Sequence, residues 1–333
     1  MRLITHWIIS ALLCWSVSAG ALTDVLADVP GDVPGRWKSA WPETDFSKIS
    51  IDPGEVFSGG PPRDGIPAIT GPVMIDVAAE DRIGPREPVM SIALPGEVPR
   101  AYPVRYLMWH EIVNDRVGDL PIAVTFCPLC NSGLVFDRRV EGQVLELGVS
   151  GLLRFSDMIM YDRTTFSWWQ QFTGEAIAGT LTGAELTALP ALLESWEAFS
   201  TRHPDGLVMD EPADHRRPYG TNPYEGYDQG TPFLYRGPPP PHGLHPLSRV
   251  VRVDTRAWPL ARLRNAGRLE EAGVILTWEE GQASALSTSD INEGREVGTV
   301  RVTAPDGTLV VHEVVFAFAF HAFTPDRVWM LGD

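Results

Sequence analysis

Short apolar runs separated by turn residues dominate the hydrophobic pattern of the chain. Such runs, rich in β-branched residues, predict strands rather than long helices. A short helix is expected over residues 103–114, because Pro103 would occupy the first turn, where a missing N–H costs nothing. Apolar residues at helical spacing predict another helix over residues 190–201. The expected strands are residues 89–94, 122–126, 134–136 and 144–149.

After the Pro-rich run at residues 238–241, the chain contains two short segments that resemble earlier ones, which we call the sequence echo. Residues 256–263 resemble residues 100–107, and residues 274–278 stand where residues 122–126 stand in the first copy. A spacing this long indicates a repeated helix-plus-strands unit rather than a solenoid. The sequence therefore predicts an α+β fold, β-rich with short helices, and leaves open whether this unit is duplicated.

Composition narrows the class of protein. The 31 glycines and 29 prolines favour turns and short strands, while 44% hydrophobic residues suffice for a real core. Acidic residues outnumber basic ones by 43 to 27, a formal net charge of -16. This charge argues against a nucleic-acid partner and against binding to an anionic membrane surface.

The first residues predict a secretory signal peptide. Arg2 precedes an apolar stretch at residues 4–17, and small residues at 19–21 provide a cleavage site near Ala21. We therefore expect an exported protein, periplasmic or extracellular, with no stable membrane insertion after cleavage. The predicted organisation is a signal peptide (1–21), an N-terminal extension (22–44), a core bearing the cysteine pair (45–235), a Pro-rich connection (236–248) and a C-terminal half-repeat packed on the core (249–333).

The most informative chemistry is one Cys-x-x-Cys. Cys14 lies in the predicted signal peptide, so Cys127 and Cys130 are the two cysteines that remain after cleavage. Two thiolates three positions apart on a turn between strands converge on one point and can bind a transition metal. A structural disulfide and a redox-active dithiol remain open, although a strand rather than a helix is expected after Cys130, unlike in thioredoxins. No phosphate loop or dinucleotide fingerprint occurs, so no nucleotide cofactor is expected.

The leading hypothesis is a Cys2His metal site, with copper favoured over zinc. His110, on the helix just before the strand that leads to the cysteines, is the predicted imidazole ligand. Met158 or Met160 would supply a softer fourth ligand, because both point to one face of a strand. Glu111 or Asp162 could orient the imidazole from behind. The function would be metal handling or metal-assisted redox chemistry.

Two other hypotheses stay open. In the first, Cys127 and Cys130 form a thiol/disulfide couple, which would make the protein an oxidoreductase. In the second, the cysteines form a structural disulfide in a non-catalytic binding module. The pocket of that module would be lined by Tyr161, Arg163, Trp168 and Trp169.

Several segments resemble one bacterial family, the domain of unknown function 3179 family. The resemblance rests on residues 59–67, 101–103, 109–115, 125–130, 155–163 and 173–179. It implies an exported protein of uncharacterised role, with His110, Cys127 and Cys130 on its most characteristic motifs, and residues 316–323 resemble the family's closing aromatic strand. The family usually has glycine after the second cysteine, where this chain has Asn131, a residue that also tolerates a left-handed turn.

Overall fold

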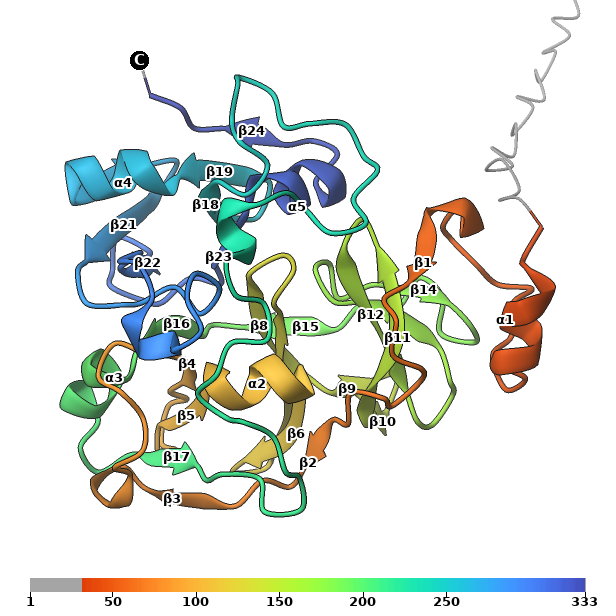
Figure 1. Ribbon diagram of the computed structural model, residues 1–333, viewed down its shortest axis with the longest axis horizontal. Helices are drawn as coiled ribbons and strands as arrows, with labels where there is room; N and C mark the ends of the chain where they lie inside the picture. The colour runs from red at the N-terminus through yellow and green to blue at the C-terminus, as the bar shows by residue number, and fades with distance from the viewer. Residues whose placement is uncertain (1–31, 333) are drawn as a thin grey trace, which may run out of the picture.

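The computed structural model describes residues 32–332 and shows five sheets arranged as a propeller-like ring (Figure 1). The predicted signal peptide lies outside the described residues. All helices are short, and none in the described part of the chain is long and apolar enough to cross a membrane. The prediction of a β-rich fold with short helices is thus confirmed. The helices are α1 (Gly35–Ala40), α2 (Val104–His110), α3 (Trp196–Arg202), α4 (Leu260–Ala266) and α5 (Ala317–Phe323), with short 3-10 turns at Pro53–Glu55, Val77–Ala79, Tyr227–Gln229 and Ile291–Glu293.

One sheet, in the order β15-β8-β7-β6-β2, carries the cysteine pair. Its central strand β7 is buried along almost its whole length, as expected for a strand covered on both faces. It ends at Cys127, and β8 begins after the turn that follows. The strands are β2 (Ile69–Thr70), β6 (Ile112–Val117), β7 (Leu120–Cys127), β8 (Ser132–Asp137) and β15 (Thr187–Leu189).

A second sheet, in the order β1-β11-β12-β13-β14, lies beside the first. Its two longest strands form a hairpin whose two-residue turn is Phe155–Ser156. Both turn residues have positive φ, +48° and +67°, as hairpin turns of this length require. The strands are β1 (Val56–Ser58), β11 (Leu147–Arg154), β12 (Asp157–Asp162), β13 (Trp168–Gln170) and β14 (Ala176–Ala178), and a separate hairpin is formed by β9 (Arg139–Val140) and β10 (Gln143–Val144).

Two of the remaining three sheets show the same element order. In each half an antiparallel strand pair leads into a seven-residue helix, and the pair is flanked by one antiparallel strand and one parallel strand. This order joins β4, β5 and α2 in one half and β18, β19 and α4 in the other, at the positions of the sequence echo. The first of these sheets is β16 (Leu192–Ser195), β4 (Pro88–Ile92), β5 (Arg100–Pro103), β17 (Leu207–Met209) and β3 (Met74–Asp76). The second is β23 (Glu313–Phe316), β18 (Arg249–Val253), β19 (Arg256–Pro259) and β24 (Val328–Trp329), and the third remaining sheet is β20 (Arg268–Glu271), β21 (Val274–Glu279) and β22 (Thr299–Thr303).

Several predicted elements differ from the structure. The helix expected over residues 103–114 ends at His110, and residues 112–114 already belong to strand β6. The strand expected over residues 144–149 is divided between β10 and β11.

Two further elements differ in type. The helix expected over residues 190–201 is strand β16 followed by α3, because Leu192 pairs with Ser91 in the sheet and Ser195 caps α3 by accepting a hydrogen bond from the Ala198 N–H. The aromatic strand expected at residues 316–323 is helix α5, apart from its first residue. In both places an apolar run fitted either element, and tertiary pairing decided.

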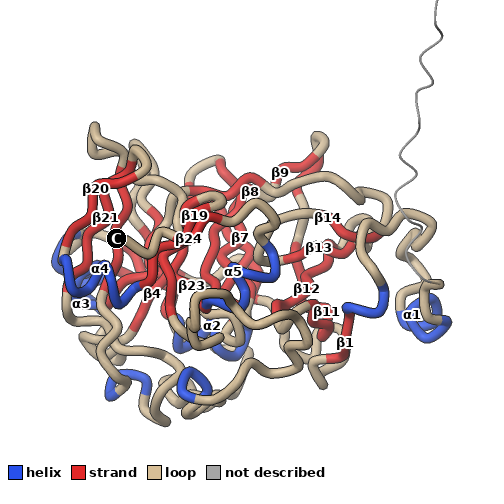
Figure 2. Tube along the Cα trace, turned by 90° about the horizontal axis from the view of Figure 1, so that it is seen from above, coloured by secondary structure: helices blue, strands red, loops and turns tan. Residues whose placement is uncertain are grey.

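The N-terminal segment packs against the second sheet rather than standing apart from it. Trp37, on α1, lies edge-on to Trp168 of β13 with 5.0 Å between ring centroids, and Trp41 does the same at 5.4 Å. Figure 2 shows α1 at one end of the molecule, beside β11 to β14. These rings belong to a smaller apolar cluster, separate from the main core that surrounds the cysteines.

A long loop over residues 210–248, called here the crossing loop, joins β17 to β18 (Figure 1). Its tyrosines pack against the main core. The Tyr227 hydroxyl donates a hydrogen bond of 2.9 Å to the Leu129 carbonyl, inside the cysteine turn. The crossing loop therefore covers the turn between β7 and β8.

A β-bulge in β11 depends on Gly151. This residue has φ of +76°, and a Cβ there would lie 2.1 Å from the Pro61 carbonyl oxygen. Gly142 has nearly the same φ, +78°, but open space around it. We expect Gly142→Ala to lower the unfolding free energy by about 1–2 kcal/mol through backbone strain alone, and Gly151→Ala to lower it by roughly 1–3 kcal/mol more. Denaturant unfolding measures both, and equal losses would contradict this account of the bulge.

Candidate functional site

The cysteine turn is held by backbone and side-chain hydrogen bonds. The Cys130 N–H donates to the Cys127 carbonyl at 3.2 Å, which closes the turn. Asn131 follows with φ of +51°, so it takes the left-handed conformation expected for this position, and its side-chain amide donates to the Val314 carbonyl at 2.6 Å. The Cys130 carbonyl accepts from the Phe316 N–H at 3.0 Å. These contacts fix both thiols from the same short segment.

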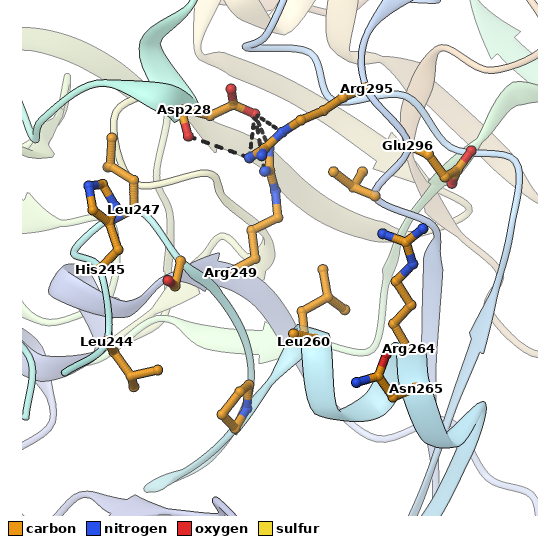
Figure 3. Close-up of a pocket in the computed structure, with 14 residues that line it drawn as sticks. Asp228, Leu244, His245, Leu247, Arg249, Leu260, Arg264, Asn265, Arg295 and Glu296 are labelled. Carbon is orange, nitrogen blue, oxygen red and sulfur yellow. Dashed lines mark hydrogen bonds and ion pairs between the residues drawn. The ribbon is translucent and has the colours of Figure 1, made fainter. Parts of the chain in front are cut away.

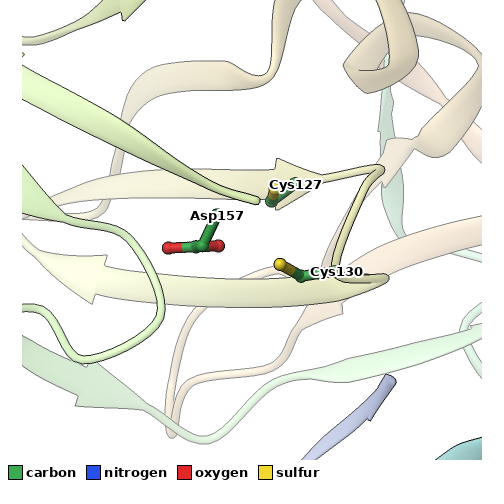
Figure 4. Close-up of side chains that lie close together, drawn as sticks. All are labelled: Cys127, Cys130 and Asp157. Carbon is green, nitrogen blue, oxygen red and sulfur yellow. The ribbon is translucent and has the colours of Figure 1, made fainter. Parts of the chain in front are cut away.

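The β11–β12 hairpin supplies a third donor, Asp157. The sulfur atoms of Cys127 and Cys130 and a carboxylate oxygen of Asp157 lie within 4.8 Å of one another (Figure 4). We call these residues the Cys–Cys–Asp group. The Cys127 thiol also lies 3.9 Å from the Ser156 carbonyl, which it approaches as a donor. The turn at Phe155–Ser156, with its positive φ angles, thus places Asp157 at the start of β12 beside the thiols.

Asp157 is only half satisfied by the protein. Its Oδ2 accepts hydrogen bonds from the Gln170 side-chain amide at 2.6 Å and from the Phe172 N–H at 2.9 Å. Its Oδ1 is buried with no hydrogen-bond partner among the described residues. Burial raises the pKa of Asp157 to about 7, against the opposing effect of its hydrogen bonds. A buried acceptor without a partner costs free energy, and the neighbouring thiols of Cys127 and Cys130 offset part of that cost, because their interaction with Asp157 lowers its pKa.

The two thiols are free and fully buried. Burial raises the pKa of Cys127, and burial together with the hydrogen bond to Cys127 raises the pKa of Cys130 further. Neither thiol therefore has the lowered pKa that marks a redox nucleophile.

Glu111 lines a cavity together with Met158 of β12. It ends α2 with φ of +57°, and its carbonyl accepts from the Phe126 N–H at 2.9 Å, which ties it to the strand that ends at Cys127. The cavity has a volume of about 300 Å³, and Leu129 also lines it. Burial, and then repulsion from Asp157, raise the pKa of Glu111 to about 8.

The structure does not bring His110 to the cysteines. Its Nδ1 lies 2.7 Å from the Pro67 carbonyl, so this nitrogen donates, and its Nε2 lies 2.7 Å from the Tyr219 hydroxyl. The remaining lone pair of the neutral ring therefore accepts the tyrosine proton and is not free for a metal. His110 is not a member of the Cys–Cys–Asp group. The chain reverses at Glu111, which places the two neighbouring side chains on different partners.

The burial of His110 predicts a specific pH dependence. Burial, together with the nearby His215 and Arg217, lowers the pKa of His110 to about 4. Below about pH 6.5 the His110 imidazole binds a proton in the unfolded chain but stays neutral in the folded chain. The unfolding free energy therefore falls as the pH falls from about 6.5 to about 4. We expect wild type to lose about 3 kcal/mol of unfolding free energy more than His110→Gln over this range. Urea unfolding at several pH values measures this, and parallel curves for the two proteins would contradict it.

The other predicted site residues have structural partners. Met158 and Met160 are buried in the main core, where Met158 lines the cavity and Met160 pairs with Trp169 across the sheet. Asp162 does not reach His110, because its Oδ2 accepts from the Trp169 indole at 3.0 Å and from the Thr165 hydroxyl at 2.8 Å. These contacts fix the turn after β12.

The predicted aromatic pocket does not form as one site. Trp168 belongs to the smaller cluster with α1, while Trp169 belongs to the main core, as alternation along a strand requires. Tyr161 and Arg163 both bind Asp64, at 2.6 Å and 2.8 Å. Tyr161 and Trp168 share the smaller cluster, but Trp169 lies in the main core, so the four side chains do not line one pocket.

A second charged cluster lies away from the cysteines, at a pocket of about 560 Å³ (Figure 3). Asp228, on the crossing loop, accepts from the guanidinium groups of Arg249 and Arg295, each at 3.1 Å, and from the Ser284 hydroxyl at 2.5 Å. Because these partners come from β18 and from loops of the C-terminal half, the cluster fastens the crossing loop to that half.

The comparison with family models matches residues 63–327 to the family described as protein of unknown function (DUF3179). The chain belongs to this family. The resemblance found in the sequence is therefore confirmed, and the match covers both the Cys–Cys–Asp group and the repeated second half. Neither the comparison with curated proteins nor the comparison with solved structures finds a match. Within this DUF3179 protein, the chemistry has to be argued from the site itself.

Sequence reasoning did not single out Asp157 as a ligand or Glu111 as a cavity residue. The one local signal for Asp157 is its place directly after Phe155–Ser156, a turn between two strand-like runs. For Glu111 the signal is its position at the end of a helix and before a strand. Both become significant only when the hairpin and the helix end meet the cysteine turn in space.

Proposed function

We propose that this protein binds one transition-metal ion through Cys127, Cys130 and Asp157. The observation that carries the proposal is the convergence of two thiols and a carboxylate within 4.8 Å of one another. The buried Asp157 Oδ1, which has no partner within hydrogen-bond distance among the described residues, also supports it. A cation would offset the cost of burying three acidic groups together.

The donor set favours zinc over copper. Zinc binds thiolate sulfur and carboxylate oxygen readily, whereas Cu(I) is selected by soft ligands alone. The preference for copper in the sequence analysis depended on a methionine thioether beside the thiolates, whereas the third donor in the Cys–Cys–Asp group is the carboxylate of Asp157. The proposed ion is therefore Zn²⁺.

Three protein ligands leave one coordination position open. Structural zinc sites usually have four protein ligands, whereas sites that act on a bound molecule keep one position for water or substrate. The cavity beside Leu129 and Met158, with Glu111 on its wall, lies next to the group. The proposed role is thus metal-dependent binding of a small molecule rather than a purely structural metal site.

A thiol/disulfide oxidoreductase is a weaker alternative. Both thiols are buried, with exposed fractions of 1% or less, so a protein disulfide could not reach them without opening of the crossing loop. The raised pKa values of both thiols also oppose thiolate attack.

Titration with Co²⁺, followed by absorbance, tests the proposal, because thiolate ligands give charge-transfer bands that water and carboxylates do not. We expect wild type to bind one Co²⁺ and Asp157→Asn to bind it at least tenfold more weakly, since an amide is a poorer ligand than a carboxylate. Asp162→Asn is the matched control, because Asp162 is buried on the same strand but outside the group. Absence of the bands, or equal affinity in wild type and Asp157→Asn, would contradict the proposal.

A further inference from the structure

The cavity beside the Cys–Cys–Asp group is predominantly apolar. It has a volume of about 300 Å³, at the lower end of the range for ligand sites, and lies between the second sheet, the cysteine turn and the crossing loop. An apolar cavity of about 150 Å³ is already large enough for benzene. The side chains that give it its character are Ile66, Leu129, Val149, Leu152, Leu153 and Met158.

Two polar side chains that line the cavity, Glu111 and Tyr224, have no hydrogen-bond partner among the described residues. The side chain of Glu111 has no hydrogen-bond partner among residues 32–332, and electrostatic repulsion from Asp157 is the main interaction it has besides its burial. The Tyr227 hydroxyl, by contrast, is already engaged with the Leu129 carbonyl at 2.9 Å. Glu111 is the carboxyl group that a bound molecule would meet there, with the Tyr224 hydroxyl in the lining of the same cavity.

The charge around the cavity selects against anions. No arginine, lysine or histidine occurs among the described residues that line it. The ionisable groups beside it are acids: Glu111, Asp157 and the two cysteines. A carboxylate or phosphate would meet no balancing cation in this apolar space, and its desolvation would cost far more than that of a neutral group.

We propose that the cavity binds a small, uncharged, largely apolar molecule whose single hydroxyl or similar polar group hydrogen-bonds to Glu111. Phe233, which also lines the cavity and is 47% exposed, marks its mouth on the crossing loop. The idea that such a molecule is the substrate or ligand of the metal rests on the proposed function. Binding to the cavity itself does not, because its lining includes none of the three metal-binding residues.

Benzyl alcohol, benzoate and toluene are suitable probes, because they share one ring and differ in the polar group. Calorimetry on the full-length protein should show benzyl alcohol binding at least tenfold more tightly than benzoate. Leu153→Trp, which fills the cavity, should weaken benzyl alcohol binding at least tenfold. Val144→Trp introduces the same side chain at a position that is 51% exposed and outside the cavity, and this variant should bind benzyl alcohol like wild type. Equal binding of benzoate, or wild-type binding by folded Leu153→Trp, would overturn the proposal.

Glu111→Met keeps the test decisive if Leu153→Trp does not fold. This variant should lower the affinity for benzyl alcohol to that for toluene, and a retained preference for the alcohol would overturn the role of Glu111. Repeating the titration with the Cys127→Ser, Cys130→Ser variant and with zinc-loaded wild type separates the two proposals. Benzyl alcohol binding without zinc binding would support the cavity proposal and overturn the proposed metal site. Zinc binding without benzyl alcohol binding would support the metal site and overturn the cavity proposal.

Discussion

Replacing both Cys127 and Cys130 with serine should abolish metal binding. The expected metal content falls from about one equivalent to less than a tenth of one, because two of the three donors become neutral hydroxyls that zinc binds poorly. The chain should still fold, since the turn is held by backbone hydrogen bonds and by the Asn131 amide rather than by the sulfur atoms. Elemental analysis of both purified proteins, with circular dichroism as the check on folding, measures the effect.

Asn131→Gly is the matched control for this variant. It removes the 2.6 Å hydrogen bond to the Val314 carbonyl, yet it keeps all three donors, and glycine takes the left-handed conformation at this position without strain. We expect it to retain the metal with some loss of stability. Metal retained by the serine variant, or lost equally from Asn131→Gly, would show that the cysteines are not the ligands.

Asp228→Ala should cause the largest loss of stability among the variants considered. Arg249, whose side chain is 5% exposed, would lose the one carboxylate that it binds among residues 32–332. Even with that partner, burial lowers the pKa of Arg249 to about 10. Breaking one side of a buried ion pair typically costs about 3–5 kcal/mol, because the remaining charge stays buried. Urea unfolding of the variant measures this loss.

Arg295→Met provides the contrast that isolates burial as the cause. Arg295 binds the same Asp228 oxygen at the same 3.1 Å, but its side chain is 47% exposed. An exposed ion pair contributes about 0–1 kcal/mol, so this variant should remain close to wild type. Equal losses in the two variants would contradict the ranking. Hydrogen exchange should also rise in the crossing loop of Asp228→Ala, because Asp228 fastens that loop.

Local chemistry allowed the region around the cysteines to be predicted from the sequence. The run at residues 122–126 lies in β7, and the turn after it contains a left-handed Asn131, as its residue type permits. The repeated order of strand, helix and strands also lies where the sequence echo places it, at α2 and α4. These features depend on residues that are neighbours along the chain.

The composition of the site could not be predicted in the same way. Asp157 reaches the cysteines through a hairpin 27 residues further along the chain, and no spacing rule fixes that encounter. His110 is close in sequence, but the positive φ of Glu111 turns the next side chain to the cavity, while Pro67 and Tyr219 hold the imidazole elsewhere. Proximity in sequence suggested His110 as the third ligand, but the tertiary contacts place Asp157 beside the cysteines instead.

The most direct test of the metal site is elemental analysis of protein purified without chelators or a metal-affinity tag, combined with a thiol count under denaturing conditions. We predict about one equivalent of zinc per chain, with the thiols of Cys127 and Cys130 both reactive after denaturation. A protein with no bound metal that also takes up none when zinc is supplied would contradict the central claim. In that case a missing pair of thiols would identify a disulfide in place of the metal.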